Sequence, residues 1–186
     1  PSSTILTHFS ETAKETGILV KQGEDEITVV NMALGAMFMG TRALCATSGG
    51  GYDLMTETVS LAGMIETPLV VILAQRPGPA TGLPTWTAQG DLNLAMYSSH
   101  GEFPRIVMAV SDVNDCFELI QHAFNFAEKY QTVVLVLTEK VIAESDVTVE
   151  PFKQGTVKIE RGLVEGAALK KLVNEEINKQ KLEVAS

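Results

Sequence analysis

Three acids stand together in the stretch QGEDEI, directly before a long apolar run. Glu24 and Asp25 suit the first turn of a helix, where carboxylates interact favourably with the helix dipole. Glu26 fits this capping role less well, because it stands three and four residues ahead of two valines and so falls near the apolar side of the helix. An acid shielded there can share a proton with a ligand nitrogen. Both interpretations, capping and chemistry, remain open for Glu26.

A second candidate is TSGGG, which lies between a predicted strand and a predicted helix. Its Ser48, Gly49 and Gly50 have backbone N–H groups that can bind an anion at a helix N-terminus. The alternative is a tight turn without a ligand. The stretch lacks the lysine of a P-loop and the complete G-x-G-x-x-G pattern.

A third candidate is the loop RPGPATGLPT, which begins with Arg76 and contains Thr81. An arginine at the end of a buried strand can form a bidentate pair with a carboxylate, although its head can also stay in solvent. His100 has no second histidine or cysteine nearby, which favours a structural or substrate-edge role. We find no spacing typical of metal ligands.

The elements that position these residues follow from the hydrophobic pattern. Apolar β-branched runs alternate with helical patterns, which predicts a three-layer α/β/α fold with a mostly parallel sheet. The predicted strands cover 18–22, 42–48, 68–75, 105–110 and 132–138, and the predicted helices cover 25–40, 52–66, 88–99 and 112–130. Residues 1–145 are predicted to form this α/β domain. Residues 146–186 read as a polar linker and an amphipathic helix, either packing on a neighbour or left from a further domain.

The net charge and the cysteine content of the chain limit the kinds of partner and cofactor that it can bind. The 186 residues carry a formal charge of −9, from 14 Lys+Arg and 23 Asp+Glu, which argues against nucleic acid or an anionic membrane as the main partner. No apolar run has the length of a membrane span. Cys45 and Cys116 lie in apolar segments, which predicts reduced thiols in a cytoplasmic protein. Two cysteines are too few for an iron–sulfur cluster.

Taken in order, the motifs carry a resemblance. The series QGEDEI, GAMFMGTRALCATSGGGYDLMTE, AGMIETPLVVILAQRPGPATGLPTWTAQGDL and HGEFPRIV resembles the α subunit of 2-oxoacid:ferredoxin oxidoreductases, chiefly the 2-oxoglutarate or branched 2-oxoacid type, over roughly residues 1–145. The corresponding region of that family is the pyrimidine-binding domain of a thiamine-diphosphate enzyme. The opening PSS resembles the end of the family's Tyr-Pro-Ile-Thr-Pro-Ser-Ser segment, so we expect its threonine and the family's first strand to be missing.

The resemblance assigns roles to the candidates. Glu26 is expected to hydrogen-bond N1′ of the cofactor's aminopyrimidine and so to promote loss of the thiazolium C2 proton. Arg76, with Thr81, is expected to bind the substrate carboxylate, and Ser48, Gly49 and Gly50 are expected to border the cofactor. Where relatives often have RGGPSTG this chain has RPGPATG, which alters the contacts of the loop.

The resemblance also implies partners. The Gly-Asp-Gly…Asn motif that binds diphosphate and Mg²⁺ is missing, and QGDLN does not match it. We therefore expect a hetero-oligomer whose β subunit holds the diphosphate, Mg²⁺ and an iron–sulfur cluster. Ferredoxin would accept the electrons and coenzyme A the acyl group. The weakly charged helices at 25–40 and 52–66 would then provide an apolar contact face.

Two alternatives remain. The chain could be the pyrimidine-domain subunit of a non-oxidative thiamine-diphosphate decarboxylase, which would use the same Glu26 without ferredoxin. It could also be a non-catalytic scaffold subunit that keeps the fold.

Overall fold

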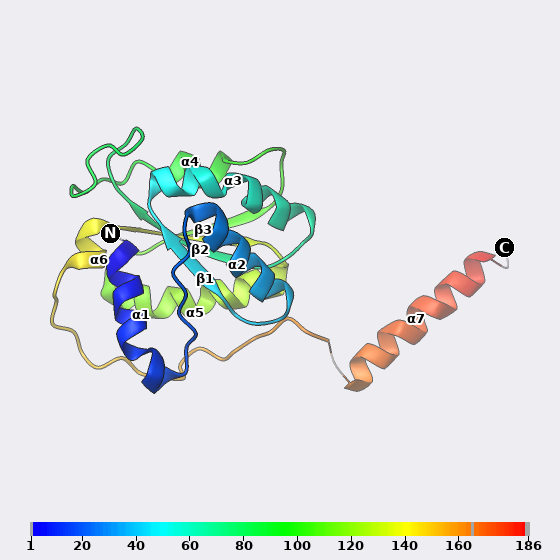
Figure 1. Cartoon of the computed structure of the whole chain (residues 1–186). Coiled ribbons are helices and arrows are strands. Elements are labelled where there is room, and N and C mark those ends of the chain that lie inside the picture. Colours follow the sequence, from blue (N-terminus) through cyan, green and yellow to red (C-terminus); the bar gives the residue numbers. More distant parts are fainter. Residues whose placement is uncertain (1, 165, 185–186) are drawn as a thin grey trace.

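The computed structural model describes residues 2–164 and 166–184 (Figure 1). Its helices and strands follow one another in the order α1 (Ser2–Thr16), α2 (Glu26–Phe38), β1 (Leu44–Thr47), α3 (Gly49–Met64), β2 (Leu69–Gln75), α4 (Leu92–Tyr97), β3 (Arg105–Ala109), α5 (Val113–Tyr130), β4 (Val133–Glu139), α6 (Lys140–Glu144) and α7 (Gly166–Val184).

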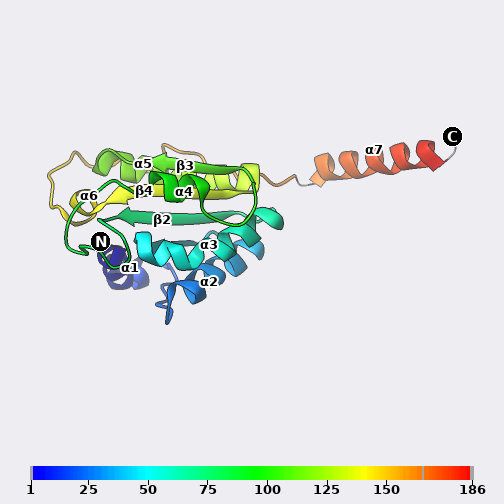
Figure 2. The same ribbon diagram turned by 90° about the horizontal axis from the view of Figure 1, so that it is seen from above.

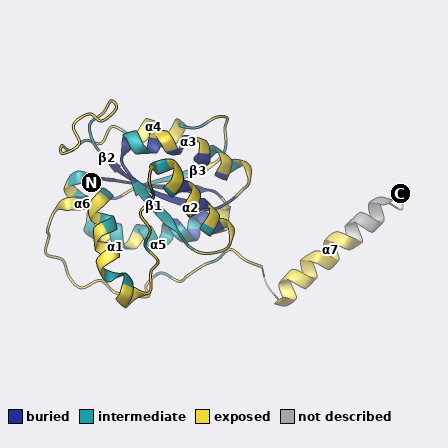
Figure 3. Cartoon of the chain, viewed as in Figure 1, coloured by how far each residue is buried: buried dark blue, intermediate teal, exposed yellow. Residues whose placement is uncertain are grey.

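Four parallel strands form one sheet in the order β1-β2-β4-β3. The sheet lies between two helical layers, with α2 and α3 on one face and α5 on the other (Figure 2). The central strands β2 and β4 are almost entirely buried (Figure 3). Strands that are apolar on both faces need helices on both sides of the sheet to shield them from water. The two helical layers observed here confirm the predicted three-layer α/β/α fold.

The helix boundaries have local causes. Asp25 is the N-cap of α2, and its Oδ1 accepts a hydrogen bond of 2.7 Å from the Thr28 backbone N–H, so the capping interpretation of this acid is confirmed. This hydrogen bond lowers the pKa of Asp25. Helix α3 begins three residues earlier than predicted, so that Gly49 and the two glycines after it form its first turn. Helix α4 is shorter than the predicted helix at 88–99.

The predicted strand at 18–22 is wrong. The chain is irregular there, and Ile18 and Leu19 are exposed. A β-branched run forms a strand only where a neighbouring strand takes its hydrogen bonds, and this segment pairs with none of the four strands. Helix α1, which precedes it, was not predicted; it contacts the edge strand β1 and α6 (Figure 1). Pro1, which opens the PSS resemblance, lies outside the described residues.

Both cysteines are free thiols. Cys45 is buried in the core beside α2 and α3, and burial raises the pKa of its thiol to about 12. Burial also raises the pKa of the half-buried Cys116, with a further contribution from Asp112 and Asp115. Neither thiol has the low pKa that makes a cysteine reactive. Along the part of the chain that is described, every helix is too short or too polar to cross a bilayer.

The segment after α6 is tied to the outer side of α5. The Phe152 ring stacks on Phe117 with centroids 4.4 Å apart. Further along, Asn125 donates to the backbone oxygen of Lys158 and accepts from the backbone N–H of Glu160. Beyond these contacts α7 extends away from the α/β domain (Figure 1). The proposed division of the chain after residue 145 remains a prediction.

A buried acid anchors the same segment. Glu128 on α5 has a side-chain exposure of only 7%, and its two carboxylate oxygens bind different arginines. Arg42, just before β1, lies 2.6 Å from Oε2, and Arg161 in the tail lies 3.1 Å from Oε1. Arg42 also donates to Asn125. The tail is therefore held to the domain by charge-assisted hydrogen bonds rather than by apolar contacts alone.

Replacing Glu128 with glutamine should destabilise the chain by about 3 kcal/mol, the lower end of the cost of removing one partner from a buried ion pair. Two partly buried arginines would lose their carboxylate. Urea unfolding of the purified chain, followed by circular dichroism, measures the effect. Glu118, an exposed acid on the same helix, provides the matched control. If E128Q and E118Q unfold at the same urea concentration, the anchoring role of Glu128 is wrong.

Candidate functional site

The predicted site residues meet beyond the carboxyl ends of β1 and β2. Helix α2 begins there with Glu26, α3 begins there with its glycine turn, and the loop after β2 begins there with Arg76. The carboxyl ends of parallel strands lie at one edge of a sheet, which is where open α/β sheets bind ligands. The fold thus brings together three stretches that are well separated in the sequence.

Glu26 lies against the glycine turn. Its side chain is half-buried, and a Cβ atom added to Gly51 would lie 2.7 Å from Glu26 Oε1. The same Cβ would overlap the hydroxyl of Thr47, the buried last residue of β1. The carboxylate of Glu26 therefore occupies the space between the start of α2 and the start of α3, and only a glycine at position 51 leaves room for it.

The other two glycines of the turn face the loop after β2. A Cβ atom on Gly50 would lie 3.3 Å from the backbone oxygen of Ala80, and one on Gly49 would lie 2.9 Å from Asp91 Oδ2. Each glycine of the turn thus allows close approach of a different segment. This packing role goes beyond a simple tight turn, and it places the start of α3 between Glu26 and the Arg76 loop.

Arg76 lines a small hollow of about 100 Å³. Its walls come from the start of α3, the loop after β2 and the start of α4, and they are formed by Gly49, Gly50, Asp53, Arg76, Pro77, Gly78, Pro79, Ala80, Asp91 and Leu94. The Gly78–Pro79 peptide bond is cis. The hollow is therefore polar at its base, with one arginine and two aspartates around the glycine turn.

Two polar atoms of this hollow are buried without a hydrogen-bond partner among the described residues, Arg76 Nε and Asp91 Oδ2. One is a donor and the other an acceptor. Burial raises the pKa of Asp91, as does the carboxylate of Asp53. The backbone N–H and the guanidinium of Arg76 act on this pKa in the opposite direction. The hollow can thus offer a cationic donor to a small anionic ligand, with the carboxyl group of Asp91 beside it.

The remaining candidates are less central. Thr81 is exposed on the Arg76 loop and lies outside the set of residues that line the hollow. Ser48 is buried at the N-cap position of α3, but its side chain makes no capping hydrogen bond. His100 is exposed in the loop before β3, and its backbone oxygen accepts a hydrogen bond from Ser60. This is consistent with the structural interpretation of His100.

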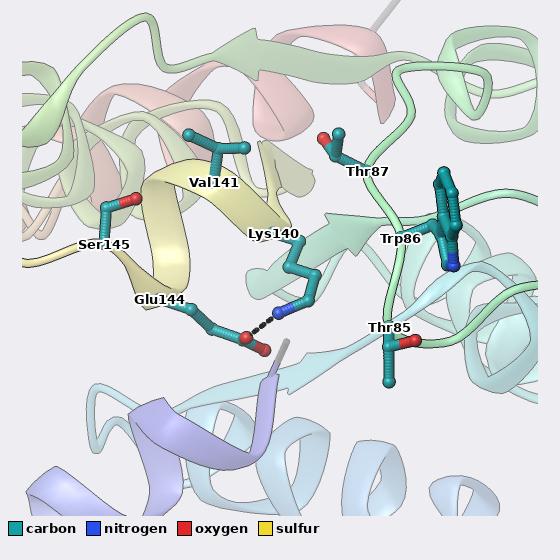
Figure 4. A pocket seen from close by; sticks show the side chains of 7 residues that line it. All are labelled: Thr85, Trp86, Thr87, Lys140, Val141, Glu144 and Ser145. Atoms are coloured by element: carbon teal, nitrogen blue, oxygen red, sulfur yellow. Dashed lines mark hydrogen bonds and ion pairs between the residues drawn. The ribbon is translucent and has the colours of Figure 1, made fainter.

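The far side of the Arg76 loop borders a second, more open hollow of about 360 Å³ (Figure 4). It lies between the loop and α6 and is lined by Thr85, Trp86, Thr87, Lys140, Val141, Glu144 and Ser145. Lys140 is directed towards Glu144, with which it forms an ion pair (Figure 4). This pairing uses the lysine within α6, so the hollow does not offer it freely to an anion.

Comparison with known proteins identifies the family of the chain. The family model described as pyruvate flavodoxin/ferredoxin oxidoreductase, thiamine-diphosphate-binding, matches residues 1–179. The chain belongs to this family. Among its relatives is subunit alpha of 2-oxoacid:ferredoxin oxidoreductase 1 of Sulfurisphaera tokodaii, which is 47% identical over 153 residues, 81% of this chain and 24% of the relative. Another is the 2-oxoglutarate synthase subunit KorA of Methanothermobacter thermautotrophicus, 39% identical over 76% of this chain and 38% of the relative.

A solved structure shares the fold. The 2-oxoglutarate:ferredoxin oxidoreductase from Magnetococcus marinus, with 2-oxoglutarate, coenzyme A and succinyl-CoA bound, superposes with a TM-score of 0.75 and 42% identity. The match covers 77% of this chain and 25% of that one. The chain thus spans about a quarter to two-fifths of the length of the proteins it matches.

The residues present fit one end of the family's cofactor. Thiamine diphosphate needs an acid at its aminopyrimidine ring, and Glu26 holds a half-buried carboxylate at the sheet edge. Within the described residues, no three His, Cys, Asp or Glu side chains are grouped to hold a metal ion.

Sequence reasoning missed Gln75 and Asp91. Gln75 is the last residue of β2 and is buried, and its Oε1 accepts a hydrogen bond of 3.0 Å from the backbone N–H of Asp91. A polar residue at the end of an otherwise apolar strand was the available signal. Asp91 was considered only as part of QGDLN, which fails to match a diphosphate motif. Its proximity to Gly49 depends on tertiary packing and has no local signal.

The glycine turn provides a stability test. Changing Gly51 to alanine should destabilise the chain by about 1–3 kcal/mol, because the added methyl group overlaps Thr47 and crowds Glu26. Gly35 within α2 is the matched control, since a Cβ atom there meets nothing within 4 Å. G35A should stabilise by about 0.5–1 kcal/mol through helix propensity. Urea unfolding measures both variants, and equal shifts for the two would contradict the close approach at Gly51.

Proposed function

We propose that this chain is the pyrimidine-binding part of the α subunit of a 2-oxoacid:ferredoxin oxidoreductase. The observation that carries the proposal is the position of Glu26, whose carboxylate is held at the sheet edge against Gly51 and Thr47. An acid placed there can hold a proton at N1′ of an aminopyrimidine ring. Thiamine diphosphate, when bound, supplies the nucleophilic carbon and the electron sink for decarboxylation. The backbone at Ser48, Gly49 and Gly50 is proposed to border the same ring.

Arg76 is the proposed binding group for the substrate carboxylate. Its buried Nε has no partner among the described residues, and an ionised oxygen is the acceptor that a guanidinium binds most strongly. Thr81, on the same loop, is proposed to contribute a hydroxyl group to the same substrate site. The chain would thus bind one end of the 2-oxoacid and orient its keto carbon towards the cofactor.

The reaction we propose is oxidative. The bond between C1 and C2 of the 2-oxoacid breaks and carbon dioxide leaves. The remaining acyl group forms a thioester with coenzyme A, releasing one proton, and two electrons pass to ferredoxin. The relatives named above, which include a 2-oxoglutarate enzyme with coenzyme A and succinyl-CoA bound, support this chemistry. It takes place inside the cell, where ferredoxin and coenzyme A are found.

A β subunit is proposed to complete the site. It would bind the diphosphate with Mg²⁺ and carry the iron–sulfur cluster that receives the electrons. Large apolar side chains remain exposed on the two helices next to the site: Ile27, Met32 and Phe38 on α2, and Leu54, Leu61 and Met64 on α3. Exposed apolar surface of this kind beside a functional site supports a subunit contact there.

Reconstitution with the β subunit tests the proposal. We expect reduction of ferredoxin that depends on a 2-oxoacid, coenzyme A and thiamine diphosphate together. Release of an aldehyde without reduction of an electron acceptor would instead identify a non-oxidative decarboxylase. Activity that survives loss of Glu26 would identify a scaffold subunit. Native mass spectrometry of the complex gives its stoichiometry.

A further inference from the structure

The two ends of the loop that carries Arg76 lie next to each other at the carboxyl end of β2. It begins directly after Gln75 and ends at Asp91, and the backbone N–H of Asp91 donates to Gln75 Oε1 at 3.0 Å. Gln75 is only 6% exposed, so this hydrogen bond lies in a shielded environment where its loss is costly. Compact surface loops whose ends meet in this way are omega loops, and they are frequently functional.

The carboxylate of Asp91 makes a second connection. Asp91 stands at the N-cap position of α4, yet its side chain makes no capping hydrogen bond there. It lies instead beside the start of α3, where a Cβ atom added to Gly49 would be only 2.9 Å from its Oδ2. A carboxylate interacts favourably with the positive end of a helix dipole. Asp91 therefore lies where the end of β2 and the starts of α3 and α4 meet, at the base of the loop.

We propose that Asp91 and Gln75 are positioning residues that close the base of the loop and so hold Arg76 at the sheet edge in the orientation that binds a substrate carboxylate. The inference rests on the proposed function of Arg76. The physical reason is rigidity: an arginine at the first position of a flexible loop must be ordered each time a ligand binds, which weakens binding. With its base closed, the loop presents the guanidinium already placed.

Two variants separate the contacts. Gln75→Leu removes the acceptor for the Asp91 backbone N–H and keeps the volume of the side chain. Asp91→Asn keeps that backbone bond and removes the charge at the start of α3. In the reconstituted complex we expect each variant to raise the KM for the 2-oxoacid about tenfold, because a small misplacement of a binding group has effects of this order. We expect kcat to change less than twofold. Glu102→Gln, on an exposed loop, is the control for loss of one negative charge.

The action through Arg76 is tested by a double-mutant cycle. In an Arg76→Lys background, Q75L and D91N should change KM less than twofold, because the group that they position is already impaired. A full tenfold effect in that background would show that Asp91 and Gln75 act elsewhere and would overturn the proposal. An unchanged KM in the single variants, or a lowered KM in D91N, would also overturn it.

A measurement that needs no catalytic turnover tests this inference independently of the proposed function. Hydrogen–deuterium exchange of peptides covering 76–90 should be about tenfold faster in Q75L than in the unmodified chain, while peptides from β4 stay unchanged. Unchanged exchange in the loop overturns the positioning role even where the enzyme is active. If the unmodified complex turns over no 2-oxoacid, the proposed function fails, and the exchange measurement still decides whether the loop base is closed as described.

Discussion

Replacing Glu26 with glutamine should lower the kcat of the reconstituted oxidoreductase by about 10²–10⁴-fold, the range typical of a lost acid–base group. Glutamine keeps the size of the side chain and its packing against Gly51, but it cannot hold an ionisable proton at the ring nitrogen of the cofactor. Because the change is nearly isosteric, the fold and the KM for the 2-oxoacid should change little. The measurement is the rate of 2-oxoacid-dependent ferredoxin reduction at saturating substrate.

The adjacent acids provide the control for this variant. Glu24 is exposed and lies just before Asp25, the N-cap residue of α2, so E24Q removes the same charge close to the same helix start. We expect E24Q to retain full activity. A complex in which E26Q and E24Q are equally active would show that the three acids serve only the N-terminus of α2, and it would favour the scaffold interpretation.

Replacing Arg76 with lysine should raise the KM for the 2-oxoacid by about 10- to 100-fold, which corresponds to the loss of a charge-assisted hydrogen bond worth about 1.5–3 kcal/mol. Lysine keeps the charge but cannot make a bidentate contact with a carboxylate. The kcat should fall less than the KM rises, since the interaction is made in both the ground state and the transition state. Initial rates over a range of 2-oxoacid concentrations measure both constants.

Two control measurements show whether the effect of R76K is specific to binding of the 2-oxoacid. Lys153→Gln removes one positive charge from the exposed tail and should leave both constants unchanged. The apparent affinity for coenzyme A should also be the same in R76K. If R76K raised the KM for coenzyme A instead of that for the 2-oxoacid, Arg76 would bind a different anionic group and our assignment would be wrong.

Much of the fold could be predicted because its signals are local. The runs that became β2 and β4 are apolar on both faces, and a continuous apolar run of strand length between helical patterns indicates a buried parallel strand. The stripe on α5 predicted that helix closely, and Asp25 marked the start of α2. The segment at 18–22 also begins with an apolar β-branched run, but pairing with a neighbouring strand is not encoded locally, and the strand prediction there was wrong.

The site was predicted in its parts but not in its contacts. Glu26, the glycine turn and Arg76 were each singled out, and the fold places them at one sheet edge. The sequence did not indicate that each glycine of the turn approaches a different segment, or that Asp91 returns to Gln75. Such contacts join residues that are 16 to 42 positions apart in the sequence, and they depend on how the helices pack against the sheet. The anchoring of the tail by Glu128 is of the same kind.

The most direct test of the central claim is the rate at which the C2 proton of the bound cofactor exchanges with deuterium, measured by quenched-flow NMR in the reconstituted complex without 2-oxoacid. This rate depends on the acid at the aminopyrimidine ring and not on coenzyme A or ferredoxin. We predict rapid exchange in the unmodified complex and in E24Q, and exchange at least about 100-fold slower in E26Q with the same thiamine diphosphate content. Equal exchange rates in E26Q and the unmodified complex would contradict the role of Glu26.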